Sequence, residues 1–120
     1  MIVLKAQRGR IALTMTGLRL GRDLCVTLSG GEREHIGAVA VCQGSPAGEA
    51  TASVVALPGH REDQLARATA SRLATRLDAV VCVACGIHLE KILPEEIAGV
   101  LEMAEELTGR LIQRLDEPDS

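Results

Sequence analysis

Apolar and polar residues alternate along the first half of the chain, and this pattern changes near residue 60. The alternating stretches are 2–7, 11–16, 24–28, 36–42 and 52–57. Because neighbouring side chains of a strand point to opposite faces, a period of two predicts five strands with one face on a core. A glycine pair at 30–31, typical of a tight hairpin turn, follows the third stretch. The pattern therefore predicts a mostly antiparallel meander.

The second half of the chain has a helical period instead. Apolar residues recur at spacings of three and four over 62–77 and again over 94–115, where Pro94 suits the first helical position. The run at 79–85 between them is apolar on both faces, which is typical of a central strand that is covered on both sides. The predicted fold class is α+β: a five-strand antiparallel meander followed by helix–strand–helix, with two helices packed on one mostly antiparallel sheet.

These elements fit one domain. We expect residues 1–115 to form a single α+β domain and 116–120 to be a flexible C-terminal tail. The apolar stripe of the second helix fits either the core or the seam of a homodimer.

The composition excludes several classes of function. The chain has 120 residues, no aromatic residue and a formal net charge of -3. Without aromatic rings it can neither stack bases nor form an aromatic cage for a cation. The acidic residues concentrate in the second half, which holds twelve Asp/Glu against seven Lys/Arg. That balance is unfavourable for nucleic acid or an anionic membrane and suits a protein partner.

The chain carries no sign of export or membrane insertion. No stretch reaches the ~18 apolar residues of a spanning helix, and the start of the chain lacks the charged region of a signal peptide. We expect a cytoplasmic protein whose four cysteines stay reduced. Cys82 and Cys85 spell C-x-x-C, but they lie in the buried strand and point to opposite faces, which favours core packing over redox chemistry.

Two segments that follow predicted strands combine glycine with histidine. The first, at 57–63, contains Gly59, His60 and Arg61, and the second, at 85–90, contains Gly86 and His88. Free amides at a helix start attract anions, and an arginine adds a bidentate donor, so these segments predict a phosphate site if they meet at one end of the sheet. The alternative interpretation is that each segment is only a turn with a capping residue.

The three histidines leave a second alternative open. His35, His60 and His88 each lie near a strand end, and together they could ligate a metal in a small metal-dependent enzyme. Their spacing is not diagnostic of a metal site. The sequence also lacks the G-x-S-x-G motif of hydrolases, the H-E-x-x-H motif of zinc proteases and the Walker phosphate-binding loop. Enzymatic activity is therefore the least favoured interpretation.

Several motifs in order resemble one known family. The segments HIGAVA at 35–40, LPGHRED at 57–63, GIH at 86–88 and PEEI at 94–97 are similar to those of the LpdD-like prenylated-flavin chaperones. The resemblance implies a non-catalytic protein that holds prenylated flavin mononucleotide (FMN) between the flavin prenyltransferase and a UbiD-type decarboxylase. It also implies a fold similar to that of small proteasome-assembly chaperones.

With this resemblance, the glycine–histidine segments become a candidate cofactor site. The residues expected to bind prenylated FMN, or FMN itself, are Gly59, His60, Arg61, Gly86, Ile87, His88 and His35. Aliphatic walls would have to replace aromatic stacking on the flavin, which suits transient binding by a carrier. The alternative is an assembly module for a decarboxylase complex that has no cofactor site.

Overall fold

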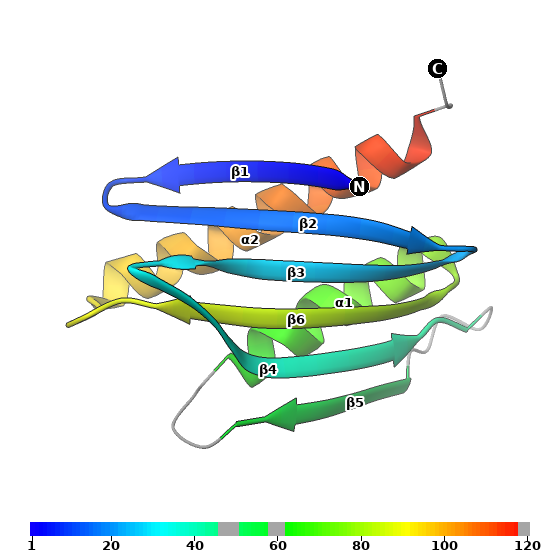
Figure 1. Ribbon diagram of the computed structural model, residues 1–120, viewed down its shortest axis with the longest axis horizontal. Helices are drawn as coiled ribbons and strands as arrows, with labels where there is room; N and C mark the ends of the chain where they lie inside the picture. The colour runs from blue at the N-terminus through cyan, green and yellow to red at the C-terminus, as the bar shows by residue number, and fades with distance from the viewer. Residues whose placement is uncertain (46–50, 58–61, 118–120) are drawn as a thin grey trace.

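The computed structural model describes residues 1–45, 51–57 and 62–117. It contains one six-stranded sheet and two long helices (Figure 1). In chain order the elements are β1 (Ile2–Arg8), β2 (Ile11–Leu20), β3 (Asp23–Gly31), β4 (Arg33–Gln43), β5 (Thr51–Ala56), α1 (Asp63–Leu77), β6 (Val80–His88) and α2 (Pro94–Asp116). The α+β fold class is confirmed, as is the start of the second helix at Pro94.

The strand order in space differs from the order along the chain. The sheet runs β1-β2-β3-β6-β4-β5, so β6 inserts between β3 and β4 and divides the five earlier strands into a three-strand meander and a β4–β5 hairpin. β6 pairs in parallel with β3, and all other pairs are antiparallel. The last strand of the chain thus occupies the centre of the sheet, as its apolar sequence favours.

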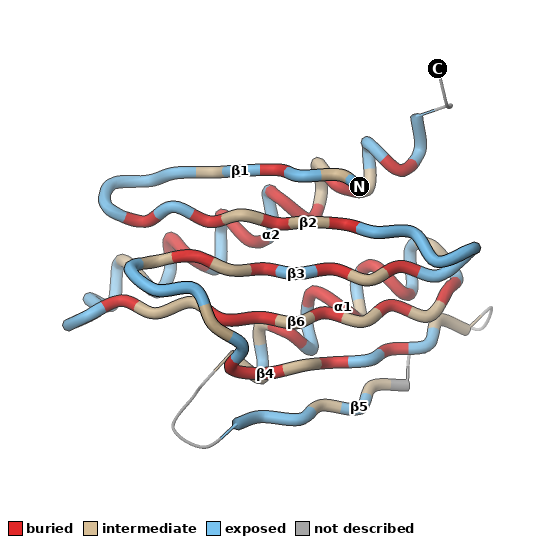
Figure 2. The backbone as a smooth tube through the Cα atoms, in the orientation of Figure 1, coloured by how far each residue is buried: buried red, intermediate tan, exposed pale blue. Residues whose placement is uncertain are grey.

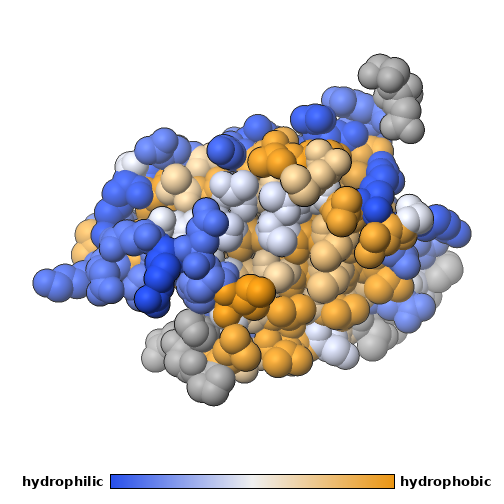
Figure 3. Space-filling view, viewed as in Figure 1, coloured by the Kyte–Doolittle hydropathy of each residue, from blue (hydrophilic) through white to orange (hydrophobic). Residues whose placement is uncertain are grey.

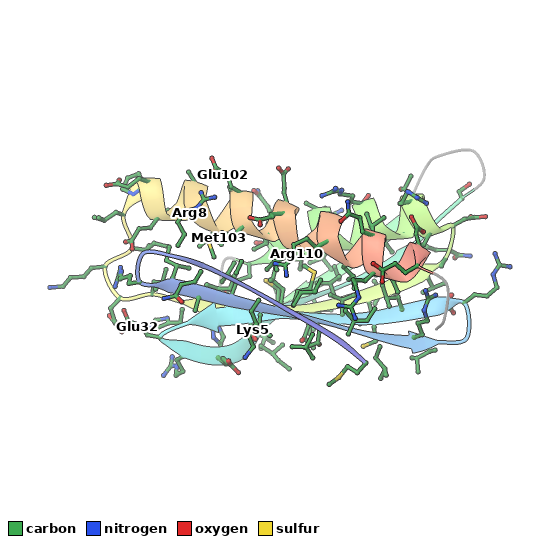
Figure 4. All side chains as sticks on the ribbon, turned by 90° about the horizontal axis from the view of Figure 1, so that it is seen from above. Lys5, Arg8, Glu32, Glu102, Met103 and Arg110 are labelled. Carbon is green, nitrogen blue, oxygen red and sulfur yellow. The ribbon has the colours of Figure 1, made fainter. Side chains whose placement is uncertain are left out.

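Both helices pack on the same face of the sheet. α1 lies across β4, β5 and β6, and α2 lies across β1 and β2. Figure 4 shows this two-layer arrangement from above, with Met103 pointing from α2 into the space between the layers. The most buried side chains of α2, Leu107 and Leu111, close the core there. Most of the apolar stripe of α2 therefore belongs to the core.

Burial alternates along the strands as the period of two predicts (Figure 2). On β6, Val81, Val83 and Cys85 are fully buried, whereas Cys82 and Ala84 on the other face are half-buried. The expectation that both faces of this strand are covered is wrong for the described residues, because both helices lie on one face. The opposite orientation of Cys82 and Cys85 is confirmed.

The ends of the molecule bear on two other expectations. α2 continues to Asp116, one residue past the proposed domain boundary, and residues 118–120 of the expected tail lie outside the described residues. The boundary at 115 therefore stays a prediction. Neither described helix is long and apolar enough to cross a membrane.

Candidate functional site

A wide bulge interrupts β4 where it runs beside the end of β6. Glu34 pairs with Ile87 and Ala38 pairs with Cys85, so residues 35–37 of β4 all lie opposite Gly86 of β6. A bulge of this kind bends its strand and redirects side chains, and such bulges are common beside binding sites. Here it brings His35, one of the predicted site residues, to the end of β6.

Gly86 is required at this position because the two backbones approach closely. A Cβ atom built on Gly86 would lie 1.7 Å from the carbonyl oxygen of His35, far inside any van der Waals contact. The glycine therefore lets the bulged strand lie directly on β6. We call this region, built from His35, Gly37, Glu62, Gly86 and His88, the β4–β6 corner.

Glu62, the residue before α1, links the helix to both strands of the corner. Its Oε1 atom accepts a hydrogen bond from the backbone N–H of Ile87 at 3.3 Å and lies 3.2 Å from Nε2 of His35. The His35 and Glu62 side chains are only 16% and 12% exposed. A side chain at position 37 would collide with the carboxylate of Glu62, so Gly37 provides the space for it. When His35 is protonated, the two side chains form a shielded ion pair.

His88 lies beside His35 and has its own acidic partner. The two imidazole rings are 6.3 Å apart between centroids and meet edge to face at 78°. Nε2 of His88 is 3.0 Å from Oε1 of Glu90, and this hydrogen bond lowers the pKa of Glu90 below its ordinary value. The corner thus places two imidazoles side by side, each next to one carboxylate.

The segment that carries the other predicted site residues is attached to this corner at both ends. Leu57 donates its backbone N–H to the carbonyl oxygen of Gly37 at 2.9 Å, and Glu62 contacts His35 and Ile87. Residues 58–61, which include Gly59, His60 and Arg61, lie outside the described residues. The flanks of the two glycine–histidine segments therefore meet at one end of the sheet, although β4 lies between β5 and β6.

One part of the sequence interpretation needs correction. Residues 86–88 do not form a junction with free amides before a helix, because they belong to β6, and α2 begins only at Pro94. The amide of Ile87 is engaged by Glu62, and the carbonyl of His88 accepts the N–H of Glu32 at 2.7 Å. The physical reason is that β6 continues between β3 and β4, where its backbone completes the sheet.

The chemistry of the described corner does not favour a nucleophile or a metal centre. Burial, followed by the charge of Glu62, raises the pKa of the nearby Cys85 thiol to about 12, so this thiol stays protonated. Within residues 1–45, 51–57 and 62–117, no group of three or more His, Cys, Asp or Glu side chains is arranged to hold a metal ion. His60, the third histidine of the possible metal site with His35 and His88, lies outside the described residues.

Sequence reasoning missed Glu62 and Gly37 as parts of the site. From the sequence, a carboxylate just before a helix has the ordinary role of favouring the positive end of that helix. In the structure its charge is directed to His35 and to the amide of Ile87. Its position within the 57–63 segment was the only signal in the sequence, and the bulge that makes the contact has no local signature.

Comparison with known proteins bears on both the fold and the family. A chain from the crystal structure of a novel chaperone complex for yeast 20S proteasome assembly matches with a TM-score of 0.65, covering 95% of each chain at 12% identity. At this identity the likeness shows the fold alone, and it agrees with the expected proteasome-assembly-chaperone fold. No curated protein sequence matches the chain.

The family assignment covers nearly the whole chain. Residues 7–116 match the family described as prenylated flavin chaperone LpdD-like domain. The match includes β2 to α2 and every residue of the β4–β6 corner. The chain therefore belongs to the LpdD-like family of prenylated flavin chaperones.

Proposed function

We propose that this protein is a non-catalytic, cytoplasmic carrier that binds prenylated FMN, or FMN, at the β4–β6 corner and delivers it to a UbiD-type decarboxylase. The flavin prenyltransferase is the proposed source of the cofactor. The observation that carries the proposal is the meeting of His35 and His88 at the point where both ends of segment 58–61 attach. Family membership supports prenylated flavin as the cargo.

The charges at the corner are compatible with a phosphate. Glu62 is paired with His35 and with the amide of Ile87, and Glu90 is paired with His88, so each carboxylate has a local counter-charge or donor. A phosphate would therefore meet less repulsion than it would beside two unpaired carboxylates. Because the amide of Ile87 is engaged, we assign phosphate binding to the side chains of His35, His88 and Arg61 and to the backbone at Gly59 and His60.

The aliphatic surroundings are suited to a cofactor that must be released. Ile36 and Leu57 are exposed next to the corner, and Ile87 is half-buried in it. These side chains offer apolar contact to a flavin ring without the stacking that an aromatic residue adds. The ring chemistry of the flavin belongs to the cofactor, and the protein would supply binding and shielding from water.

Titration of the full chain with FMN and with prenylated FMN tests the site. We expect Arg61→Ala to weaken binding about tenfold, which corresponds to the loss of roughly 1.4 kcal/mol. His88→Gln should weaken binding as well, because the imidazole donor is lost. Arg22→Ala is the matched control, since Arg22 is exposed in the turn at the opposite end of β3. Full affinity in both Arg61→Ala and His88→Gln would refute the site.

Delivery is tested separately with a UbiD-type apoenzyme. We expect the decarboxylase to gain activity faster from prenylated FMN bound to the carrier than from the free cofactor. Capture of the apoenzyme by a protein that binds neither flavin would instead support the assembly module. Binding of flavin without any transfer would refute delivery and leave the site intact.

A further inference from the structure

One face of the sheet is covered by no described helix. α1 and α2 both pack on the side that holds Val26 and Val83, and the opposite side faces the viewer in Figure 1. We call this opposite side the open face. Its central residues are Thr16, Cys25, Thr27, Val39, Val41 and Cys82.

The centre of the open face lacks the charges that a sheet face in water usually carries. Among the described outward positions of β2, β3, β6 and β4, charged side chains occur only near the strand ends, at Asp23 and Arg33. The edge strand β1 adds the exposed Lys5, opposite Thr14 of β2. Val41 and Val55 are 42% and 65% exposed on adjacent strands. In Figure 3, apolar residues form a continuous patch over the middle and lower strands, bordered on the left by hydrophilic residues. An apolar patch of this kind indicates an interaction surface.

The polar groups at the centre of the open face already have partners within the chain. The hydroxyl groups of Thr16 and Thr27 hydrogen-bond to each other across β2 and β3. Cys25 and Cys82 are cross-strand neighbours on β3 and β6 and interact through their thiols. Because these groups need no water as partner, covering them costs little desolvation free energy.

The size and charge of the open face fit a second copy of this chain. Six strands ~4.8 Å apart and roughly 25 Å long give a footprint of about 600–700 Å² on each copy. Two such faces bury about 1,300 Å² in total, which lies in the range of stable interfaces. A twofold axis brings like residues together, and an uncharged centre makes this possible without repulsion between like charges.

The outer surface of α2 is the competing candidate, and its charges disfavour self-association. Leu101 is 50% exposed there, but Glu105 and Glu106 are exposed beside it, as is Glu102, which pairs with Arg8. Pairing two copies through this surface would bring like charges together. We therefore infer that two copies of this chain pack open face against open face, giving a helix–sheet–sheet–helix dimer with the two β4–β6 corners accessible at its rim. The inference does not depend on flavin binding.

Molecular mass in solution, measured by light scattering over a range of concentrations, tests the dimer. We expect the full chain to have twice its 12.7 kDa mass. Val41→Glu should shift the equilibrium at least tenfold toward monomer, because the dimer would bury two unpaired carboxylates. Leu101→Glu makes the same change on the helical surface and should leave the dimer intact.

Alkylation of Cys25 gives a second measurement that needs no variant. In the dimer its thiol is covered, so labelling of the native chain should be slow at high concentration and accelerate on dilution. A chain that is monomeric at all concentrations, or a dimer that Leu101→Glu dissociates and Val41→Glu does not, would overturn the inference. A monomer whose Cys25 is protected only by a decarboxylase would likewise overturn it and assign the face to that partner.

Discussion

Replacing Gly86 by alanine is the sharpest perturbation of the β4–β6 corner. The added methyl group would lie 1.7 Å from the carbonyl oxygen of His35 and 2.4 Å from its carbonyl carbon. Both atoms belong to the backbone of the β4 bulge, so no side-chain rotation relieves the clash. To restore an ordinary contact, the bulge must move by at least ~1.5 Å.

The expected cost follows from this displacement. Overpacking of a closely packed region usually costs about 1–3 kcal/mol, and a backbone clash belongs at the upper end of that range. Moving the bulge also separates His35 from Glu62, which are 3.2 Å apart in the native structure. We therefore expect Gly86→Ala to lower the free energy of unfolding by about 2–3 kcal/mol and to weaken flavin binding.

Gly99→Ala is the matched control because the same chemical change has the opposite sign there. Gly99 lies inside α2, and a Cβ atom at that position would touch only the side chain of Arg8, at 3.7 Å. Alanine is favoured over glycine in a helix interior by roughly 0.5–1 kcal/mol, so this variant should be more stable than the wild type. The two variants should differ by about 3 kcal/mol.

Urea unfolding followed by far-ultraviolet circular dichroism measures both changes, since the chain has no aromatic residue for fluorescence. All samples need the same protein concentration, because a dimer makes stability depend on concentration. The histidine side-chain resonances, measured by nuclear magnetic resonance, should shift at His35 in Gly86→Ala and stay unchanged in Gly99→Ala. Wild-type stability in Gly86→Ala would refute the close approach of β4 to β6.

Three other predictions concern the rest of the fold. Arg10 contacts Glu96 through two hydrogen bonds and lowers its pKa to about 2, from an ordinary value of 4.5. Between these two pH values the unfolded state therefore binds more protons than the folded state, and the free energy of unfolding should fall as the pH drops from about 4.5 to about 2. Arg10→Gln should flatten this pH dependence when acid unfolding is measured. Leu107→Ala removes a fully buried side chain and should cost about 2.5–5 kcal/mol in urea unfolding; a loss below 1 kcal/mol would contradict the core position. The Cys85 thiol should resist alkylation until the chain unfolds, as mass spectrometry of labelled peptides can establish, and equal labelling of native and unfolded chains would contradict its burial.

Local patterns in the sequence determined the elements and the faces that they bury. The period of two in the first half identifies the strands, and Pro94 with its apolar stripe identifies α2, because both signals depend only on neighbouring residues. The same patterns place Cys85 in the core and Cys82 on the other face. The resemblance in the motifs at 57–63 and 86–88 identified the family, which the match over residues 7–116 confirms.

The arrangement of the β4–β6 corner was decided by contacts between distant parts of the chain. Alternation tells which side of a strand is apolar but not which strand lies next to it, so the insertion of β6 between β3 and β4 could not be predicted. The bulge at 35–37 lies against Gly86, between the pairing of Glu34 with Ile87 and that of Ala38 with Cys85. Glu62 lies 27 positions after His35 in the chain, and its carboxylate contacts His35 because the bulge places that histidine beside the start of α1. Long-range packing free energy, rather than local preference, therefore determined the site.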